Sequence, residues 1–303
     1  MNNPFENVTI LDFTHVYSGP YCTMLFADLG ARVIKVERPG SGDDTRHYLP
    51  FKNDESGYFA YLNRNKESIT LDLKSPEGKE IALGLMKQSD IVIENFSAGT
   101  MKKLGLSYEE ARKVRPDIIY ASISGFGQTG PLCHKAAYDN IAQAMGGLLR
   151  VTGYPDQAPV KVGVSIADAN AGIHAAFCLM AALYYREHTG KGQYIDVSMM
   201  ETTMSVLENF VIQYTLNGVV PERMGNEHSA SAPFDVYVTK DDYIAVATAS
   251  NRLFSRMQDA MGLDIMSDPR FAENTLQKLC RAEADYRSVD EGTYDGRHRR
   301  LVR

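Results

Sequence analysis

Short apolar runs rich in β-branched residues alternate with longer stretches of helical periodicity through the first two thirds of the chain. This rhythm is typical of βαβ units, which build a largely parallel sheet. We expect strands at residues 8–13, 32–37, 68–73, 90–94, 117–123 and 194–197. We expect the intervening helices at residues 19–29, 76–88, 138–149, 170–187 and 198–217. The sequence therefore predicts the α/β class, with a doubly wound, Rossmann-like large domain.

The domain organisation follows from a change of pattern after residue 218. Residues 234–238 and 243–247 are two alternating runs around a polar turn, which indicates an antiparallel hairpin. We expect a large α/β domain over 1–218 and a smaller α+β domain over 219–280. In residues 281–303 nearly half of the side chains are charged and no aliphatic periodicity is visible, so we expect an irregular charged tail.

Composition excludes several classes of partner. The net charge of −6 is opposite in sign to that of a typical nucleic-acid or anionic-membrane binder. No basic segment followed by an apolar run begins the chain, and the longest apolar run, near 175–185, is too short to span a bilayer. The cysteines and histidines show no metal-type spacing. We therefore expect a cytoplasmic protein with no metal, no nucleic-acid partner and no membrane contact.

A glycine pattern at residues 125–130 resembles a dinucleotide-binding loop. That fingerprint needs a helix directly after its last glycine and an acidic residue at the end of the next strand. Here Pro131 follows at once, and no Asp or Glu lies between Gly146 and Tyr154. A nicotinamide site is therefore not expected.

One carboxylate and several cations are candidates for chemistry. Asp168 lies at the start of an apolar helix, where the helix dipole favours a negative charge. Spacing alone allows it to be an N-cap or a nucleophile. Basic residues follow successive strands and border an irregular stretch at 40–65. Together they can form a phosphate site in the crevice of an α/β sheet. These residues are Lys35, Arg38, Arg64, Lys66, Lys74, Lys102 and Lys103.

Motifs spread over residues 8 to about 275 resemble the class III CoA-transferases, the family of formyl-CoA transferase and carnitine CoA-transferase. The matching strings occur in the family's order at residues 16–25, 27–31, 33–40, 63–66, 70–74, 94–96, 124–131, 190–193 and 195–199. The glycine pattern at 125–130 belongs to this set. The resemblance implies a two-domain α/β subunit in an interlocked homodimer that transfers CoA between carboxylic acids.

The same resemblance assigns roles to individual residues. It implies that Asp168, in the segment 167–172, is the nucleophile that forms an aspartyl anhydride and then an aspartyl-CoA thioester, and that the helix start keeps it ionised. No cofactor is implied beyond coenzyme A, which arrives as an acyl-CoA; the second substrate is a small carboxylic acid. The residues implied to bind CoA are His15, Val16, Tyr17, Arg38, Leu71, Lys74, Asn95 and Phe96.

Three departures from the family pattern leave alternatives open. Related 2-methylacyl-CoA racemases use a histidine where Tyr138 stands here, and a tyrosine of ordinary pKa near 10 is a poor base. The glycine run of the formyl-CoA transferase branch is missing around 225–233. Family members also usually have a longer C-terminal portion, which suggests a truncated or frameshifted end. A racemase or epimerase, or a catalytically silent CoA-binding product, are therefore the alternatives to CoA transfer.

Overall fold

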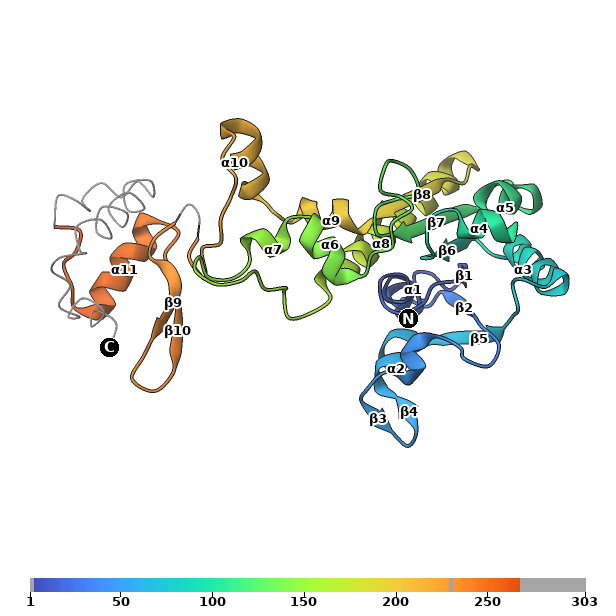
Figure 1. Cartoon of the computed structure of the whole chain (residues 1–303), viewed down its shortest axis with the longest axis horizontal. Coiled ribbons are helices and arrows are strands. Elements are labelled where there is room, and N and C mark those ends of the chain that lie inside the picture. The colour runs from blue at the N-terminus through green and yellow to red at the C-terminus, as the bar shows by residue number, and fades with distance from the viewer. Residues whose placement is uncertain (1–2, 229–230, 268–303) are drawn as a thin grey trace. The chain divides into compact units, whose positions relative to one another are not determined.

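A computed structural model describes residues 3–228 and 231–267 of the chain (Figure 1). The chain forms two compact units. Unit 1 contains residues 1–149 and 161–211, and unit 2 contains residues 150–160 and 212–303. The predicted charged tail at 281–303 and the last residues of the predicted small domain lie outside the described residues.

A parallel six-stranded sheet organises unit 1. Its strands run in the order β5-β2-β1-β6-β7-β8, and every neighbouring pair is parallel. The bounds are β1 Thr9–Asp12, β2 Arg32–Glu37, β5 Lys66–Thr70, β6 Ile91–Glu94, β7 Ile119–Ser124 and β8 Tyr194–Ser198. This is the doubly wound order in which the chain starts in the middle of the sheet and reverses direction between β1 and β6. The prediction of a parallel α/β fold is confirmed.

Both faces of the sheet are covered, which explains why its central strands carry apolar residues at successive positions. Successive residues of β1 point to opposite faces, so Ile10 packs in one hydrophobic cluster and Leu11 in the other. The first cluster lies under α1 (Ser18–Asp28) and α8 (Ile166–Thr189). The second lies under α3 (Pro76–Gln88), α4 (Thr100–Leu104) and α5 (Tyr108–Val114) (Figure 1).

Helix α8 is the central helix of unit 1. Its apolar residues Ala171, Ala175, Leu179 and Ala182 recur at helical spacing and are buried in the first cluster. By length and composition alone this helix could cross a membrane, but its buried stripe packs in the core of unit 1. Close approach to α1 depends on Gly172, because a Cβ there would lie 2.6 Å from the carbonyl oxygen of Ser18.

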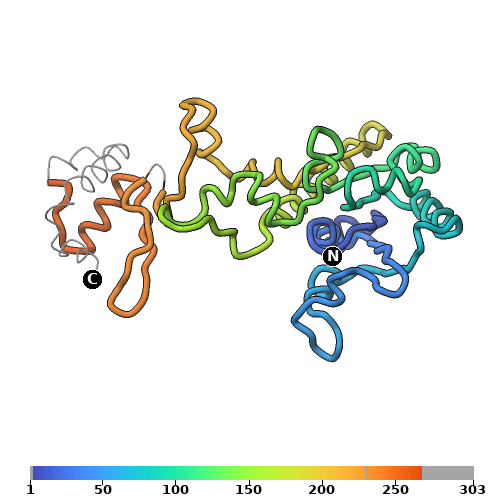
Figure 2. Tube along the Cα trace, viewed as in Figure 1, coloured from blue at the N-terminus to red at the C-terminus, as the bar shows by residue number. Residues whose placement is uncertain are grey.

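The remaining elements are shorter. In chain order they are η1 Asp44–His47, β3 Phe51–Lys52, β4 Glu55–Ser56, α2 Gly57–Asn63, α6 Asp139–Met145, α7 Leu148–Val151, α9 Met199–Ser205, α10 Asn209–Asn217, β9 Phe234–Val238, β10 Tyr243–Ala247 and α11 Asn251–Met261. The antiparallel hairpin of β9 and β10, orange in Figure 2, has the predicted bounds. The irregular stretch predicted at 40–65 contains η1, β3, β4 and α2 instead of a plain loop.

The single helix predicted at 198–217 was wrong. Two helices, α9 and α10, occupy this range, and the chain turns between them at Glu208, where φ is +48°. A non-glycine residue in the left-handed region ends a helix because that conformation cannot continue its hydrogen-bond ladder. The residue pattern alone did not show this turn, because apolar side chains continue on both sides of it.

Candidate active site

The turn between β1 and α1, residues 13–18, lies where the strand order reverses. In open α/β sheets, ligands bind at the carboxyl ends of the strands at this switch point. The loop after β6 holds the turn directly: Asn95 Oδ1 accepts from the backbone N–H of His15 at 2.9 Å, and Asn95 Nδ2 donates to the His15 carbonyl at 2.8 Å. The two sides of the switch point are therefore tied together.

A cavity of about 330 Å³ opens beside this turn. Its walls come from the segments that follow β1, β2, β5 and β6, as expected for parallel strands whose carboxyl ends meet at one edge. Five of the eight predicted CoA-binding residues line it, namely His15, Arg38, Leu71, Lys74 and Phe96. Val16, Tyr17 and Asn95 are not part of its wall, although Asn95 positions His15.

The cavity combines an aromatic surface with two exposed cations. The rings of Phe96 and His15 stack with centroids 5.5 Å apart, and burial lowers the pKa of His15. Arg38 is exposed and pairs with Asp44, while its Nε donates to the Gly42 carbonyl at 3.3 Å. Lys74 is exposed at the rim. An apolar stacking face next to cations suits a nucleotide with phosphates.

Two of the lysines predicted to join an anion site are buried and paired with aspartates. Lys35 is 1% exposed and its Nζ lies 2.8 Å from Asp43 Oδ2, and Lys66 is equally buried with its Nζ 3.3 Å from Asp12 Oδ2. Burial lowers the pKa of Lys66 to about 8, against the opposing effect of Asp12. Both lysines pair with buried aspartates, and Lys35 also forms part of the cavity wall.

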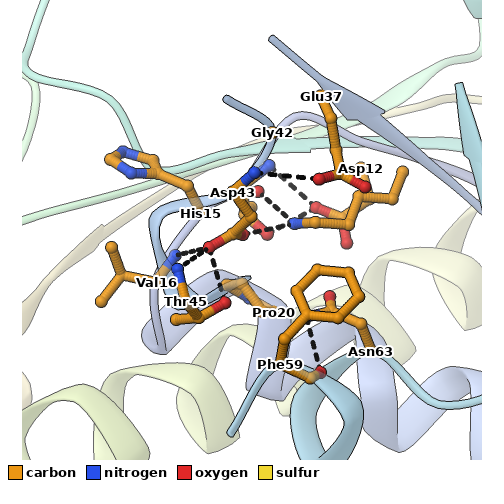
Figure 3. A network of polar contacts seen from close by, with 12 residues as sticks. Asp12, His15, Val16, Pro20, Glu37, Gly42, Asp43, Thr45, Phe59 and Asn63 are labelled. Atoms are coloured by element: carbon orange, nitrogen blue, oxygen red, sulfur yellow. Dashed lines mark hydrogen bonds and ion pairs between the residues drawn. The ribbon is translucent and has the colours of Figure 1, made fainter. Parts of the chain in front are cut away.

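These ion pairs hold the turn at residues 13–18 in place. Figure 3 shows Asp43 with Val16 and Thr45 directed toward its carboxylate. Val16 adopts the left-handed conformation at φ +66°, and its N–H donates to Asp43 Oδ1 at 3.3 Å. Lys35 Nζ donates to the Thr14 carbonyl at 2.7 Å. Left-handed backbone at a β-branched residue is unfavourable, so the surrounding bonds must stabilise this turn.

Asp168 lies in the first helical turn of α8. It is next to Ser18, which is at the end of the β1–α1 turn. The backbone N–H and the hydroxyl of Ser18 both hydrogen-bond its carboxylate. Burial, followed by repulsion from Asp139, nevertheless raises the pKa of Asp168 to about 7. The expectation that the helix start alone keeps it ionised was therefore wrong. Asp168 does not line the cavity; the turn separates the two.

The N-cap interpretation of Asp168 was also wrong. Ser165 occupies the N-cap position, and its side chain makes no capping bond. Asp139, the first residue of α6, supplies the acceptor instead, taking the N–H groups of Ala167 at 2.8 Å and Asp168 at 3.3 Å. Sequence reasoning missed this role because the two segments are far apart in the chain.

Tyrosine rings from separate segments surround Asp168. The Asp168 charge contributes to the raised pKa of Tyr17, which reaches about 12 mainly through burial, and to that of Tyr58 on α2. Tyr17 stacks on Tyr21 with centroids 5.6 Å apart and meets the edge of Tyr58 at 6.2 Å. Tyr17 therefore belongs with Asp168 and not with the cavity. Tyr138 is 71% exposed.

The glycine loop at 125–130 does not begin a helix. Gly127 and Gly130 have φ values of +80° and +88°, and the next helix, α6, starts only at Asp139. The N–H of Gln128 donates to Asp196 Oδ2 at 2.8 Å, which fixes the loop on β8. This geometry differs from that of a dinucleotide-binding loop, in which the last glycine leads directly into a helix.

Comparison with known proteins identifies relatives along most of the chain. A sequence profile of CoA-transferase family III matches residues 5–291. The acetyl-CoA:oxalate CoA-transferase of Acetobacter aceti is 45% identical over 273 residues, which cover 89% of this chain and 70% of that protein. The succinyl-CoA:glutarate CoA-transferase of Mus musculus is 41% identical over 282 residues, covering 92% and 65%. The chain thus spans about two thirds of the length of these relatives.

Solved structures agree with these matches. A CAIB/BAIF family protein from Brucella suis matches with a TM-score of 0.81 and 38% identity, covering 94% of this chain and 76% of that one. Rv3272 from Mycobacterium tuberculosis matches with a TM-score of 0.82 and 28% identity, covering 99% and 81%.

Proposed function

The chain belongs to CoA-transferase family III, and from this premise we propose that it transfers CoA from an acyl-CoA to a small free carboxylic acid. The observation that carries the proposal is the placement of Asp168, a half-buried carboxylate held by Ser18 at the end of a turn whose other end lines a nucleotide-sized cavity. Relatives named for oxalate and glutarate support a dicarboxylic acceptor, with acetyl-CoA or succinyl-CoA as donor.

The proposed reaction uses Asp168 as a covalent nucleophile. Its carboxylate oxygen bonds to the acyl carbon, the carbon–sulfur bond breaks, and the electron pair leaves with CoA thiolate, giving a mixed anhydride. The thiolate then attacks the Asp168 carbonyl carbon and releases the donor acid, which leaves an aspartyl-CoA thioester. The acceptor acid then attacks the aspartyl thioester and releases CoA thiolate, which gives a second mixed anhydride. The thiolate attacks the acyl carbon of the acceptor, so that the new acyl-CoA forms and Asp168 leaves as a carboxylate. Splitting one difficult exchange into several easier steps is the gain.

We propose that the nucleotide end of CoA occupies the cavity. The Phe96–His15 stack offers an apolar face for adenine, and Arg38 and Lys74 provide charge for the phosphates. The pantetheine arm then follows residues 14–18 toward Asp168. The free thiols Cys22, Cys133 and Cys178 and the acyl-CoA substrate fit a cytoplasmic enzyme.

A second copy of the chain is the proposed protein partner. Large apolar side chains recur on one face of α8 and stay exposed: Ile173, Phe177, Met180 and Tyr184 are 49%, 67%, 41% and 70% exposed. This spacing places them on one stripe of the helix, opposite its buried face. An exposed stripe of this kind supports a homodimer. Light scattering should give a dimer mass that Phe177→Glu reduces to that of a monomer.

The test of the reaction is Asp168→Ala. With acetyl-CoA or succinyl-CoA and a panel containing oxalate and glutarate, mass spectrometry should detect new CoA esters with wild type and less than about a thousandth of that rate with the variant. Hydroxylamine should trap a covalent adduct only when Asp168 is present. Asp28→Ala is the matched control, because Asp28 pairs with Arg64 on the surface.

The same assay separates the alternatives. A racemase would exchange the α-proton of a 2-methylacyl-CoA with deuterated water in the absence of any acceptor acid. A silent CoA-binding product would bind acyl-CoA and give no new ester with any pair. Transfer by Asp168→Ala at the wild-type rate would contradict the role of Asp168 as the nucleophile, and no transfer by the wild type with any pair would contradict the proposed function.

A further inference from the structure

Two side chains of α6 hold the start of α8. Gln143 Oε1 accepts from the Val162 N–H at 3.0 Å, and Gln143 Nε2 donates to Asp139 Oδ2 at 2.6 Å. Asp139 Oδ1 in turn accepts from the N–H groups of Ala167 and Asp168 at 2.8 and 3.3 Å. Gln143 is 0% exposed and Asp139 is 9% exposed. Hydrogen bonds with little access to water therefore hold the segment that leads into α8.

This arrangement places a second negative charge beside the nucleophile. Asp139 repels the charge of Asp168, whereas Ser18 donates hydrogen bonds to it. Tyr17, just before α1, and Tyr58, from α2, also sense the Asp168 charge. A neutral cap such as serine or asparagine would satisfy the same helix N–H groups without repulsion. The choice of a carboxylate therefore has an electrostatic consequence.

We propose that Asp139 is a positioning residue that, with Gln143, fixes the start of α8 and destabilises the free Asp168 carboxylate relative to its acylated forms. The inference rests on the proposed function. When Asp168 forms an anhydride or a thioester it loses its negative charge, and the repulsion from Asp139 disappears. The repulsion between the two carboxylates thus favours formation of the covalent intermediates. It also makes Asp168 more basic and hence a more reactive nucleophile.

The test compares two α6 variants that separate charge from scaffold. Asp139→Asn keeps Oδ1 as the acceptor for α8 and removes the charge, but it also replaces the acceptor of the Gln143 Nε2 bond with an NH2 group, so the Gln143 bonds must be compared separately. Gln143→Met removes both Gln143 hydrogen bonds and leaves the Asp139 charge. The readout is kcat/KM against pH with acetyl-CoA and oxalate or succinyl-CoA and glutarate, whichever pair the wild type turns over faster. The acidic limb of that profile reports the free enzyme.

For Asp139→Asn we expect the acidic limb to move down by about one pH unit, as for the loss of a neighbouring like charge. The rate at high pH should fall about tenfold, because one pH unit is a tenfold change in the equilibrium between charged and neutral Asp168. Gln143→Met should lower the melting temperature and the rate while the acidic limb stays in place.

Several outcomes would overturn the inference. An unmoved acidic limb in Asp139→Asn would show that the charge has no influence on Asp168. If the acidic limb moves equally in both variants, Asp139 acts only as a structural cap. If Asp139→Asn fails to fold, the amide cannot hold the helix start. If the wild type transfers no CoA with either pair, the proposed function itself fails; if Asp168→Ala retains transfer, the role of Asp168 as nucleophile fails. Both results are distinct from the other three.

Discussion

Replacing Asp168 with asparagine should make the protein more stable, by an amount that grows with pH. The pKa of Asp168 is raised from its ordinary value of 3.8 to about 7, first by burial and then by Asp139. Between these values the folded chain binds a proton that the unfolded chain has released. The free energy of unfolding of wild type therefore falls as the pH rises from about 4 to about 7, and the variant lacks this loss.

The magnitude follows from the displacement of the pKa. The interval from 3.8 to about 7 is about three pH units, and each unit corresponds to about 1.4 kcal/mol. The full effect is about 4 kcal/mol. Because the carboxylate is partly exposed, we expect at least about 2 kcal/mol at pH 8 and close to zero at pH 4. Asparagine can still accept a hydrogen bond from Ser18, so the change in geometry is small.

The assay is urea unfolding of both proteins at intervals from pH 4 to pH 8. Glu37→Gln is a control of opposite sign, because the pKa of Glu37 is lowered to about 2, with bonds from Arg46 and Ser68 outweighing burial. Its stabilising contribution is present above pH 4.5 and is lost as the pH falls toward 2, so this variant should be less stable than wild type at neutral pH. A stability difference between Asp168→Asn and wild type that is constant over the whole pH range would refute the reasoning.

Three further results are expected. Lys74→Ala should weaken CoA binding about fivefold in calorimetry, with a smaller effect at high salt, because an exposed cation acts on phosphates through a screened charge. Lys66→Met should cost about 3–5 kcal/mol in unfolding free energy by leaving Asp12 buried and unpaired, and adding Asp12→Asn should recover part of it. Gly172→Ala should lower both stability and activity, since its Cβ would displace Ser18 from Asp168; unchanged activity would argue against that contact.

The sheet was predictable because its signal is local. Strands buried on both faces carry apolar residues at successive positions, and Ile91, Val92 and Ile93 of β6, all fully buried, show this. The start of α8 was placed at residue 170 but lies at Ile166, because Asp168 and Asn170 are polar and obscure the apolar periodicity of the first turn. Element type was therefore easier to predict than element boundaries.

The site was predictable only in its residue types. The resemblance to a family selected Asp168 and the residues that line the cavity, but spacing along the chain contains nothing about which side chains meet Asp168. Ser18 and Asp139 reach it from α1 and α6, and these contacts exist only after the sheet has assembled. The same holds for Lys35 and Lys66, whose burial depends on aspartates from neighbouring strands and loops.

The turn at residues 13–18 explains why the strand order matters for chemistry. Lys35, from β2, holds the Thr14 carbonyl, Asn95, from the loop after β6, holds His15, and Asp43 holds Val16. Each support comes from a different segment at the same edge of the sheet. Ser18, the first residue of α1, then bonds Asp168, the proposed nucleophile, on α8. Because the wall of the cavity and the support of Asp168 share one strained turn, we expect a ligand that displaces His15 to change the hydrogen bonds available to the Asp168 carboxylate as well.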